Sequence, residues 1–417
     1  MEERQDAALA RINLFENAQS SIEITAFSTL PGETRTLFFS SVVDAADRGV
    51  DVRILLDGLF HNIWNKDIFR AFSHHPNIEL RLYEPFDWIR PWTWNNRLHD
   101  KLIIVDDQYA LIGGRNIGDR YYAPDGYEGA TNDRDVMVLN RGNEWEHSVI
   151  DDVKHYFQLL WDHEYTEQSV KKLTTRQREK GKQLLGELRM AYQEQQERYD
   201  GFFNQDINWY EKSVPVNKIR FIHNPIERFN KKPVIWNEMA RFIEEAEESI
   251  ILQSPYVIPT KEMTQFLSFN DTTAEQLTIL TNSLAASPNL LAYSGYMQHR
   301  EQIANNGISL YEFQSTTESN HTKSFIFDGE ISVVGSFNLD ARSTFLNTES
   351  MIVVESKEFA SLLEDKIEKV IYEDSLQVAN DGSLLSSVSV EEAPVSRGKA
   401  FFTKLLSYVT RFFHHLL

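Results

Sequence analysis

The sequence predicts an α/β protein built from two similar halves, each with helices packed around a largely parallel sheet. Amphipathic helical segments alternate with short apolar strands, which is typical of βαβ units. One pattern recurs, because residues 246–252, AEESIIL, resemble residues 18–24, AQSSIEI. A repeat of this length in two copies indicates a duplicated domain rather than a solenoid.

Four elements open the first half in the order helix, strand, helix, strand. Residues 7–19 have the apolar spacing of an amphipathic helix, and residues 22–25 form a short apolar strand. A second helix is expected over residues 33–48, and a strand follows at residues 50–56. The second half has a matching apolar strand at residues 277–280.

Composition shifts divide the chain into five consecutive segments. The connector is rich in Gln, Glu, Lys and Arg, as expected for a solvated helix, and the linker is rich in Ser, Val and Glu. The segments are a first half over residues 1–165, a charged helical connector over 166–212, a second half over 213–377, a linker over 378–397 and a separate C-terminal unit over 398–417.

The composition excludes several classes of protein. The 417 residues are 41% apolar and 25% charged, which is ordinary for a globular protein. The absence of cysteine excludes disulfide scaffolds, thiolate metal sites and cysteine nucleophiles. The net charge of −20 argues against broad nucleic-acid binding, which needs a basic surface. No apolar run reaches the roughly 18 residues of a membrane span, and the charged N-terminus lacks a secretory signal. We therefore expect a soluble or peripheral intracellular protein.

Two stretches share the motif His-x-Lys-x4-Asp-x6-Gly-(Gly/Ser)-x-Asn. A lone His-x-Lys pair in a strand is usually a surface or core pair, but two complete copies with one spacing favour a functional site. The polar residues of the motifs are His99, Lys101, Asp106 and Asn116 in the first copy, and His321, Lys323, Asp328, Ser336 and Asn338 in the second. The first copy has Gly114 where the second has Ser336.

These residue types suit phosphate binding and transfer. His and Lys two positions apart in a strand project to the same face. If the copies meet about a pseudo-twofold axis, one imidazole can attack phosphorus while the other protonates the leaving oxygen. The expected phosphate ligands are Lys101, Asn116, Lys323, Ser336 and Asn338. The lysines would stabilise the developing charge and repel a cation, so we expect neither a metal nor another cofactor.

Each motif histidine needs a partner that orients its other ring nitrogen. Aligning the strands that follow the two motifs places Glu349 opposite Asp135. These two carboxylates are therefore the predicted partners of the histidines.

The two motifs resemble the paired HKD motifs of the phospholipase D superfamily, over residues 7–377. The resemblance implies a duplicated α/β/α sandwich of two pseudo-twofold-related halves, with the active site between them. It also implies a phosphohistidine intermediate formed without a metal. Family practice makes the first histidine, here His99, the nucleophile and His321 the acid and later base, although the sequence leaves the roles open. Asp106 and Asp328 belong to the catalytic motifs, but such aspartates tend to be structural in this family.

The flanks of the motifs resemble the bacterial cardiolipin synthases, most closely the C-type, at residues 113–119, 280–286, 335–340 and 346–349. This implies transfer of a phosphatidyl group to phosphatidylglycerol, with phosphatidylglycerol or phosphatidylethanolamine as the donor. A phospholipase D that forms phosphatidic acid would use the same residues with water as the acceptor. A nuclease of the superfamily and an inactive membrane scaffold are further alternatives. The sequence does not identify an accessory protein.

Residues 398–417 predict a basic amphipathic helix, which can lie on an anionic bilayer surface. The linker is expected to detach this helix from the fold; a helix packed on the protein's own core or in a dimer is the alternative. The residues predicted to contact the membrane are Phe401, Phe402, Lys404, Leu405, Arg411, Phe412 and Phe413. We therefore expect a peripheral protein on the cytoplasmic side of the cell membrane. The tryptophan-rich stretch 86–94 is a second candidate membrane contact.

Overall fold

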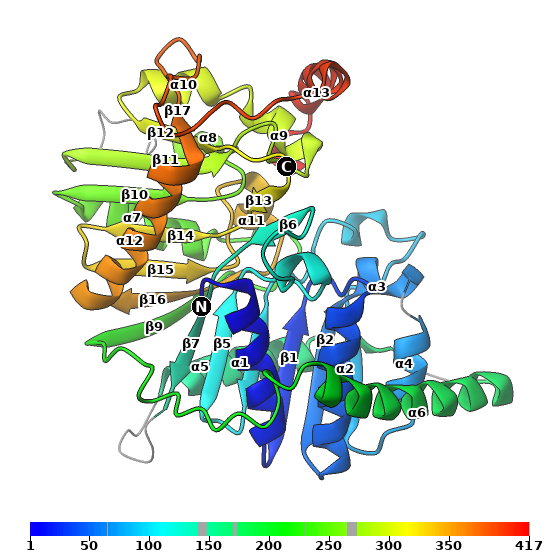
Figure 1. Ribbon diagram of the computed structural model, residues 1–417. Coiled ribbons are helices and arrows are strands. Elements are labelled where there is room, and N and C mark those ends of the chain that lie inside the picture. Colours follow the sequence, from blue (N-terminus) through cyan, green and yellow to red (C-terminus); the bar gives the residue numbers. More distant parts are fainter. Residues whose placement is uncertain (65, 141–147, 170–172, 230, 265–272, 417) are drawn as a thin grey trace. The chain divides into compact units, whose positions relative to one another are not determined.

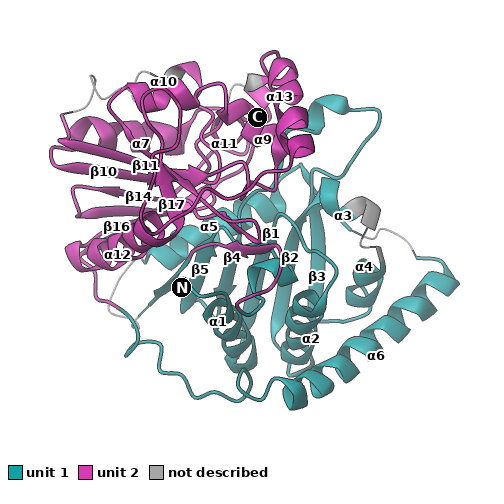
Figure 2. Ribbon diagram, turned by 45° about the horizontal axis from the view of Figure 1, so that its top comes forward, with its two compact units in different colours: residues 1–124, 135–213 teal, residues 125–134, 214–417 magenta. Residues whose placement is uncertain are grey.

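The computed structural model describes the chain except for residues 65, 141–147, 170–172, 230, 265–272 and 417 (Figure 1). The described residues form two compact units (Figure 2). The first contains Met1–Pro124 and Asp135–Ser213, and the second contains Asp125–Arg134 and Val214–Leu417. Each unit has its own sheet and its own apolar core.

The first unit contains a seven-stranded sheet in the order β7-β5-β4-β1-β2-β3-β8. Strands β1, β2 and β3 are parallel, and antiparallel strands extend the sheet at both sides. The strands are β1 (Ser21–Ala26), β2 (Asp51–Asp57), β3 (Ile78–Tyr83), β4 (Leu102–Val105), β5 (Tyr109–Gly113), β7 (Asp135–Leu139) and β8 (Thr166–Gln168).

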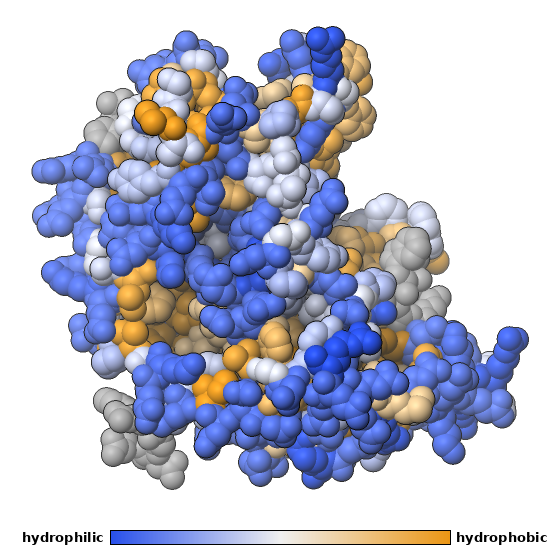
Figure 3. All heavy atoms as spheres, in the orientation of Figure 1, coloured by the Kyte–Doolittle hydropathy of each residue, from blue (hydrophilic) through white to orange (hydrophobic). Residues whose placement is uncertain are grey.

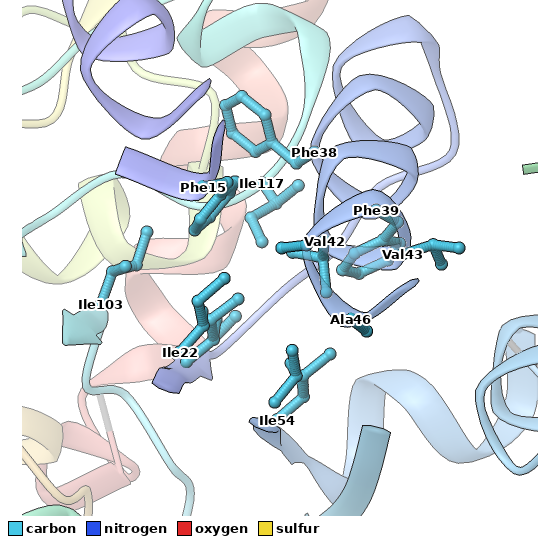
Figure 4. Packing of buried hydrophobic residues seen from close by; sticks show 14 of the residues in the cluster. Phe15, Ile22, Phe38, Phe39, Val42, Val43, Ala46, Ile54, Ile103 and Ile117 are labelled. Carbon is cyan, nitrogen blue, oxygen red and sulfur yellow. The ribbon is translucent and has the colours of Figure 1, made fainter. Parts of the chain in front are cut away.

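Helices cover both faces of this sheet. Ile22 and Ile54 belong to a core that includes Phe39 of α2 (Figure 4). On the other face, Arg53 of β2 lies 5.1 Å from the ring centre of Phe157 in α5. This arrangement follows from the alternation of side chains along a strand. The helices are α1 (Arg4–Asn17), α2 (Glu33–Asp47), α3 (Gly58–Trp64), α4 (Lys66–Phe72), α5 (Val149–Asp162) and α6 (Thr175–Arg198), with short 3-10 turns η1 (Pro91–Thr93) and η2 (Asp119–Tyr121).

The segment expected to be a solvated connector contains α6, and this helix belongs to the first unit. It packs against α2 and α4, with Leu185 and Tyr192 buried. Ser40 Oγ in α2 donates a hydrogen bond to Gln195 Oε1 at 2.8 Å. The charged residues of α6 lie on its remaining surface, so the helix is amphipathic rather than fully solvated.

The second unit contains an eight-stranded sheet in the order β17-β12-β11-β10-β14-β15-β16-β9 and a two-stranded sheet of β6 and β13. Strands β10, β11 and β12 are parallel, as β1, β2 and β3 are in the first unit. The strands are β6 (Ala130–Asn132), β9 (Lys218–His223), β10 (Ser249–Gln253), β11 (Gln276–Asn282), β12 (Ser309–Phe313), β13 (Glu318–Asn320), β14 (Ser324–Phe327), β15 (Ile331–Gly335), β16 (Ser350–Glu355) and β17 (Ser375–Gln377).

The large sheet of the second unit is also covered by helices. The core includes Trp236 and Met239 of α7 together with Ile250 and Leu252 of β10, while α12 contacts β12, β15 and β17. The helices are α7 (Val234–Glu245), α8 (Lys261–Thr264), α9 (Leu290–Tyr296), α10 (Arg300–Asn305), α11 (Ala341–Phe345), α12 (Lys357–Asp374) and α13 (Arg397–Thr410), with the 3-10 turn η4 (His414–Leu416).

The two large sheets share the register of their central strands. Ile24 of β1 pairs with Ile54 of β2, and Leu252 of β10 pairs with Ile279 of β11. In both sheets the next neighbour, β4 or β14, is antiparallel to the first strand. The predicted duplicated α/β architecture is therefore confirmed down to individual residue pairs.

A short stretch from the first half of the sequence folds into the second unit. Strand β6 pairs in parallel with β13, which directly precedes His321. Thr131 Oγ1 lies 3.1 Å from Ser319 Oγ, and the His321 N–H donates to the Asn132 carbonyl at 2.7 Å. This pairing brings the residue after β6, Asp133, to the second motif.

Candidate active site

The first motif flanks the β4–β5 hairpin. His99 is 7% exposed, and its ring meets the Phe27 ring edge-on with centroids 4.9 Å apart. Lys101 Nζ donates to the His99 carbonyl at 2.5 Å and lies 5.4 Å from the centre of the Phe27 ring. Asn116 follows β5, and its Nδ2 donates to the Tyr121 hydroxyl at 3.1 Å. The motif therefore places an imidazole and an ammonium beside Phe27, and an amide beside Tyr121.

The second motif flanks the β14–β15 hairpin and contains a hydrogen-bonded histidine–carboxylate pair. His321 Nδ1 lies 2.6 Å from Oδ2 of Asp133, whose side chain is fully buried. Lys323 Nζ lies 2.7 Å from His321 Nδ1 and also donates to the His321 carbonyl. Because a carboxylate only accepts hydrogen bonds, we assign the Nδ1 proton to the bond with Asp133. Nδ1 then accepts no hydrogen bond from Lys323, whose ammonium donates to the His321 carbonyl instead. This assignment leaves Nε2 as the reactive nitrogen.

Burial shifts the pKa of two groups near His321. Burial lowers the pKa of Lys323 to about 8, although Asp133, Glu349 and Asp340 favour its charged form. Burial also raises the pKa of Asp340 to about 6. Perturbed values of this kind are common where titratable groups are gathered for chemistry.

The prediction that Asp135 orients a motif histidine is wrong. Asp135 Oδ2 accepts hydrogen bonds from Arg11 Nη2 at 3.0 Å and Arg115 Nη1 at 2.8 Å. All three side chains are buried, so Asp135 balances the charge of two arginines inside the first unit. The contact expected of it is made by Asp133, two residues earlier.

The sheet register explains this difference. Gly113 of the first motif pairs with Asp135, whereas the equivalent Gly335 pairs with Met351. Counting back two residues in each strand makes Asp133, not Asp135, the counterpart of Glu349. Asp133 and Asp135 both fit the sequence pattern, because residues two apart share one face of a strand. The signal that separates them is pairing register, which the sequence alone does not contain.

Glu349 is fully buried and bonds within the second unit. Ser336 Oγ donates to Glu349 Oε2 at 2.5 Å, and Asn347 Nδ2 donates to Oε1 at 3.3 Å. A hydroxyl has one proton, so Ser336 in this arrangement supports Glu349 and does not donate to a phosphate. The phosphate-binding role of Ser336 and the histidine-orienting role of Glu349 both stay predictions.

The two motif asparagines share an unusual feature. Asn116 and Asn338 are 6% and 7% exposed, and the Oδ1 atom of each has no hydrogen-bond partner among the described residues. Buried polar atoms are nearly always paired in folded proteins. Each amide therefore retains capacity for a hydroxyl of a ligand or, after rotation of the amide, for a phosphoryl oxygen.

The motif aspartates bind backbone amides in the same way in both units. Both residues adopt a positive φ of 52° just after their strands. Asp106 accepts from the N–H groups of Gln19, Ser20 and Ser21 at 2.7–2.9 Å, and Asp328 from those of Glu247, Glu248 and Ser249 at 2.8–3.2 Å. Burial opposes ionisation, yet the hydrogen bonds from Ser21, Gln19 and Ser20 hold the pKa of Asp106 below its usual value. This geometry favours a structural role.

No group of three or more His, Asp and Glu side chains in the described part of the chain could hold a metal ion.

Helix α13 packs on α9 with its polar face inward. Thr403, Ser407 and Thr410 are buried, and Gln298 Nε2 donates to Thr410 Oγ1 at 2.8 Å. Lys399 Nζ donates to the Ala285 carbonyl at 3.0 Å. The expectation that the linker detaches this helix from the fold is therefore wrong.

The apolar face of α13 is exposed, as Figure 3 shows along the outer edge of this helix. Phe401 and Phe412 are 72% and 77% exposed. The other exposed residues of the predicted membrane-contact set are Phe402, Lys404, Leu405, Arg411 and Phe413. A second exposed apolar group, in the first unit, contains Trp88, Ile89 and Trp92. Within the described residues, no helix is long and apolar enough to cross a membrane.

Comparison with known proteins identifies relatives of this chain. A family model described as cardiolipin synthase, PLD-like domain matches residues 12–161 and 239–371, which include both motifs. Cardiolipin synthase C of Escherichia coli is 29% identical and aligns over 91% of this chain and 86% of its own. An uncharacterized protein of Helicobacter pylori is 28% identical over 86% of this chain and 76% of its own. The crystal structure of a phosphatidylserine synthase from Haemophilus influenzae has a TM-score of 0.69 at 13% identity, covering 100% of this chain and 94% of that one. At that identity the likeness shows the fold alone.

Proposed function

The chain belongs to the family of cardiolipin synthase PLD-like domains, and we propose that it is a phosphatidyltransferase that makes cardiolipin. The observation that carries the proposal is the pair of complete motifs at equivalent hairpins, with His321 bonded to a buried carboxylate. The cardiolipin synthases among its relatives support the choice of substrate.

In the proposed reaction, His99 is the nucleophile and His321 is the acid and then the base. Attack by His99 forms a phosphorus–nitrogen bond and breaks the bond from phosphorus to the head-group alcohol, which takes a proton from His321. A glycerol hydroxyl of phosphatidylglycerol then attacks phosphorus and gives its proton to His321. The phosphorus–nitrogen bond breaks, and cardiolipin is released.

The second motif fits the acid–base role. Asp133 fixes the His321 tautomer and stabilises the imidazolium that forms when the base takes a proton. The Lys101 and Lys323 ammonium groups would bind phosphoryl oxygens and stabilise the negative charge of the transition state. Asn116 and Asn338 add neutral donors to the same oxygens.

The direct test is mass spectrometry of lipids after incubation of the protein with vesicles of phosphatidylglycerol, with and without phosphatidylethanolamine. We expect cardiolipin, and we expect its loss in His99→Ala. Dependence on phosphatidylethanolamine would identify that lipid as the donor. Formation of phosphatidic acid without cardiolipin would show that the protein is a hydrolase and not a synthase. No turnover of either lipid would contradict both activities.

We also propose that the protein binds peripherally to the anionic, cytoplasmic surface of the cell membrane through the outward face of α13. The proposal is supported by exposed aromatic residues beside the cations Lys404 and Arg411. Binding at the membrane surface would give the enzyme direct access to its lipid substrates.

Co-sedimentation with vesicles tests this proposal. The double variant Phe401→Ser/Phe412→Ser should bind phosphatidylglycerol vesicles roughly 100-fold more weakly, because it lacks two phenylalanine side chains that would be buried in the bilayer surface. Tyr372→Ser is the matched control, since Tyr372 is 69% exposed on α12. Equal binding of the double variant and the wild type would contradict the role of α13.

A further inference from the structure

Asp57 and Asn282 occupy equivalent positions in the two large sheets. They are the last residues of β2 and β11. Ile54 and Ile279 are equivalent in register, and each of the two polar residues lies three positions further along its strand. Both side chains are buried, with exposed fractions of 0% and 1%. No step of the proposed reaction uses either residue.

Asp57 holds the residue that directly precedes His99. Its Oδ2 accepts the N–H of Leu98 at 3.0 Å. Its Oδ1 accepts the N–H of Leu59 at 3.0 Å and faces Arg97 Nη1 at 3.4 Å. Each of these neighbours is a donor, which is the environment that suits an acceptor-only carboxylate.

Asn282 holds the residue that directly precedes His321, but through a different pattern. Its Oδ1 accepts the Asn320 N–H at 2.9 Å, and its Nδ2 donates to the Asn320 carbonyl at 2.7 Å. Nδ2 also lies 3.2 Å from the Pro255 carbonyl. This environment needs one acceptor and one donor, which a carboxamide supplies and a carboxylate does not.

The motif lysine makes a further contact with the backbone of each histidine. Lys101 donates to the His99 carbonyl, and Lys323 donates to the His321 carbonyl. The backbone at each histidine is therefore held by a polar residue at the end of β2 or β11, which lies two strands away from β4 or β14 in its sheet, and by the motif lysine. Such fixation matters because small displacements of a reacting group reduce rates strongly.

We infer that Asp57 and Asn282 are positioning residues that fix His99 and His321 through the preceding residue, and that the two cannot exchange roles. The effect on turnover rests on the proposed transferase function. The effect on the histidines themselves does not.

Asn282→Asp is the sharpest variant because it is nearly isosteric. The ionised carboxylate would face the Asn320 and Pro255 carbonyls and repel them, so we expect kcat to fall roughly 10- to 100-fold with little change in KM. Protonation of the new carboxyl restores a donor. The ratio of variant to wild-type activity should therefore rise as the pH falls.

Asn282→Ala is the matched control, because it removes the contacts without adding a titratable group. Its activity ratio should be low and independent of pH. Thermal melting at each pH measures the folded fraction, so that activity is compared per folded molecule. A flat ratio for Asn282→Asp, or full activity of Asn282→Ala, would overturn the inference.

A second readout needs no lipid. Hydrogen exchange at the imidazole C2 positions, followed by mass spectrometry over a pH series, reports on each histidine separately. Asn282→Ala should change the exchange profile of His321 and leave that of His99 as in the wild type, and Asp57→Asn should do the reverse. Equal changes at both histidines, or none, would reject the positioning role.

If the wild type turns over no lipid, the transferase proposal fails while this experiment still decides the inference. The Asn282 variants suffice if Asp57→Asn does not fold.

Discussion

The two motif hairpins share one backbone scaffold but have different side-chain surroundings. The ring of His99 meets Phe27, whereas the ring of His321 bonds Asp133. Lys101 lies near the same aromatic ring, whereas burial lowers the pKa of Lys323 to about 8. The carboxylate beside His321 suits the acid–base role proposed for this histidine, because it stabilises the imidazolium that forms on proton uptake.

The scaffold itself is conserved between the two regions of the molecule. Asp106 and Asp328 have the same φ of 52° and bind the same kind of backbone amides. The comparison therefore predicts that variants of the scaffold act alike in both units, and that variants of the surroundings do not.

The largest expected effect comes from the histidines. His99→Ala and His321→Ala should each reduce cardiolipin formation by about 1,000-fold or more, because each removes a covalent or proton-transfer partner. Only a variant that keeps the nucleophile can form the intermediate. Mass spectrometry of His321→Ala with phosphatidylglycerol should show a phosphatidyl adduct on His99. An adduct on His321 in His99→Ala would reverse the roles.

Asp133→Asn should reduce kcat roughly 100- to 1,000-fold. The amide can donate to Nδ1 and so favours the wrong tautomer of His321. Asp125→Asn, an exposed position in the same segment, should retain wild-type turnover. Steady-state kinetics of both variants measure the difference, and equal rates would remove Asp133 from the mechanism.

The pH profile of kcat/KM should show an effect smaller than those of the histidine and Asp133 variants, and this effect comes from Lys323 in the second motif. Lys323 loses its proton as the pH rises through about 8, so kcat/KM should fall by up to about tenfold per pH unit above that value. Above this pH the free energy of unfolding should instead rise with pH, because the unfolded chain then binds more protons at this lysine than the folded chain does. Lys323→Arg keeps the charge and should move the alkaline limb upward. A limb that stays in place would assign it to another group.

The smallest effect on activity is expected from the motif aspartates. Asp106→Asn and Asp328→Asn should each lower the free energy of unfolding by about 1–3 kcal/mol, since charged acceptors of backbone amides are lost. Activity per folded molecule should stay within about threefold of the wild type. Denaturant titration and single-point assays measure both quantities. Lost activity at unchanged stability in either variant would assign that aspartate a chemical role.

Several elements of both units were predictable from the sequence. The strand expected at residues 277–280 lies inside β11, and the one expected at residues 50–56 overlaps β2. The helix expected over residues 33–48 matches α2, Glu33–Asp47. These elements were predictable because apolar periodicity is local and directly reflects which face is buried.

Helix α13 shows where local pattern is insufficient. The apolar periodicity correctly predicted an amphipathic helix. The face that packs on α9, however, is the one with small polar residues, Thr403, Ser407 and Thr410. An amphipathic pattern says that two faces differ and does not say which face a neighbour covers. Gln298 and Lys399 supply the polar contacts that decide it.

The sequence by itself determined the duplicated fold, the two motifs and the class of chemistry, because identical spacing in a repeat carries that information. Only the tertiary structure decided that Asp133 bonds His321, that Asp135 balances two arginines, and that Asp57 and Asn282 hold the histidine-bearing backbone. The reason is physical. These contacts join residues far apart in the chain, and strand register, which is a property of pairing rather than of one strand, determines which of them meet.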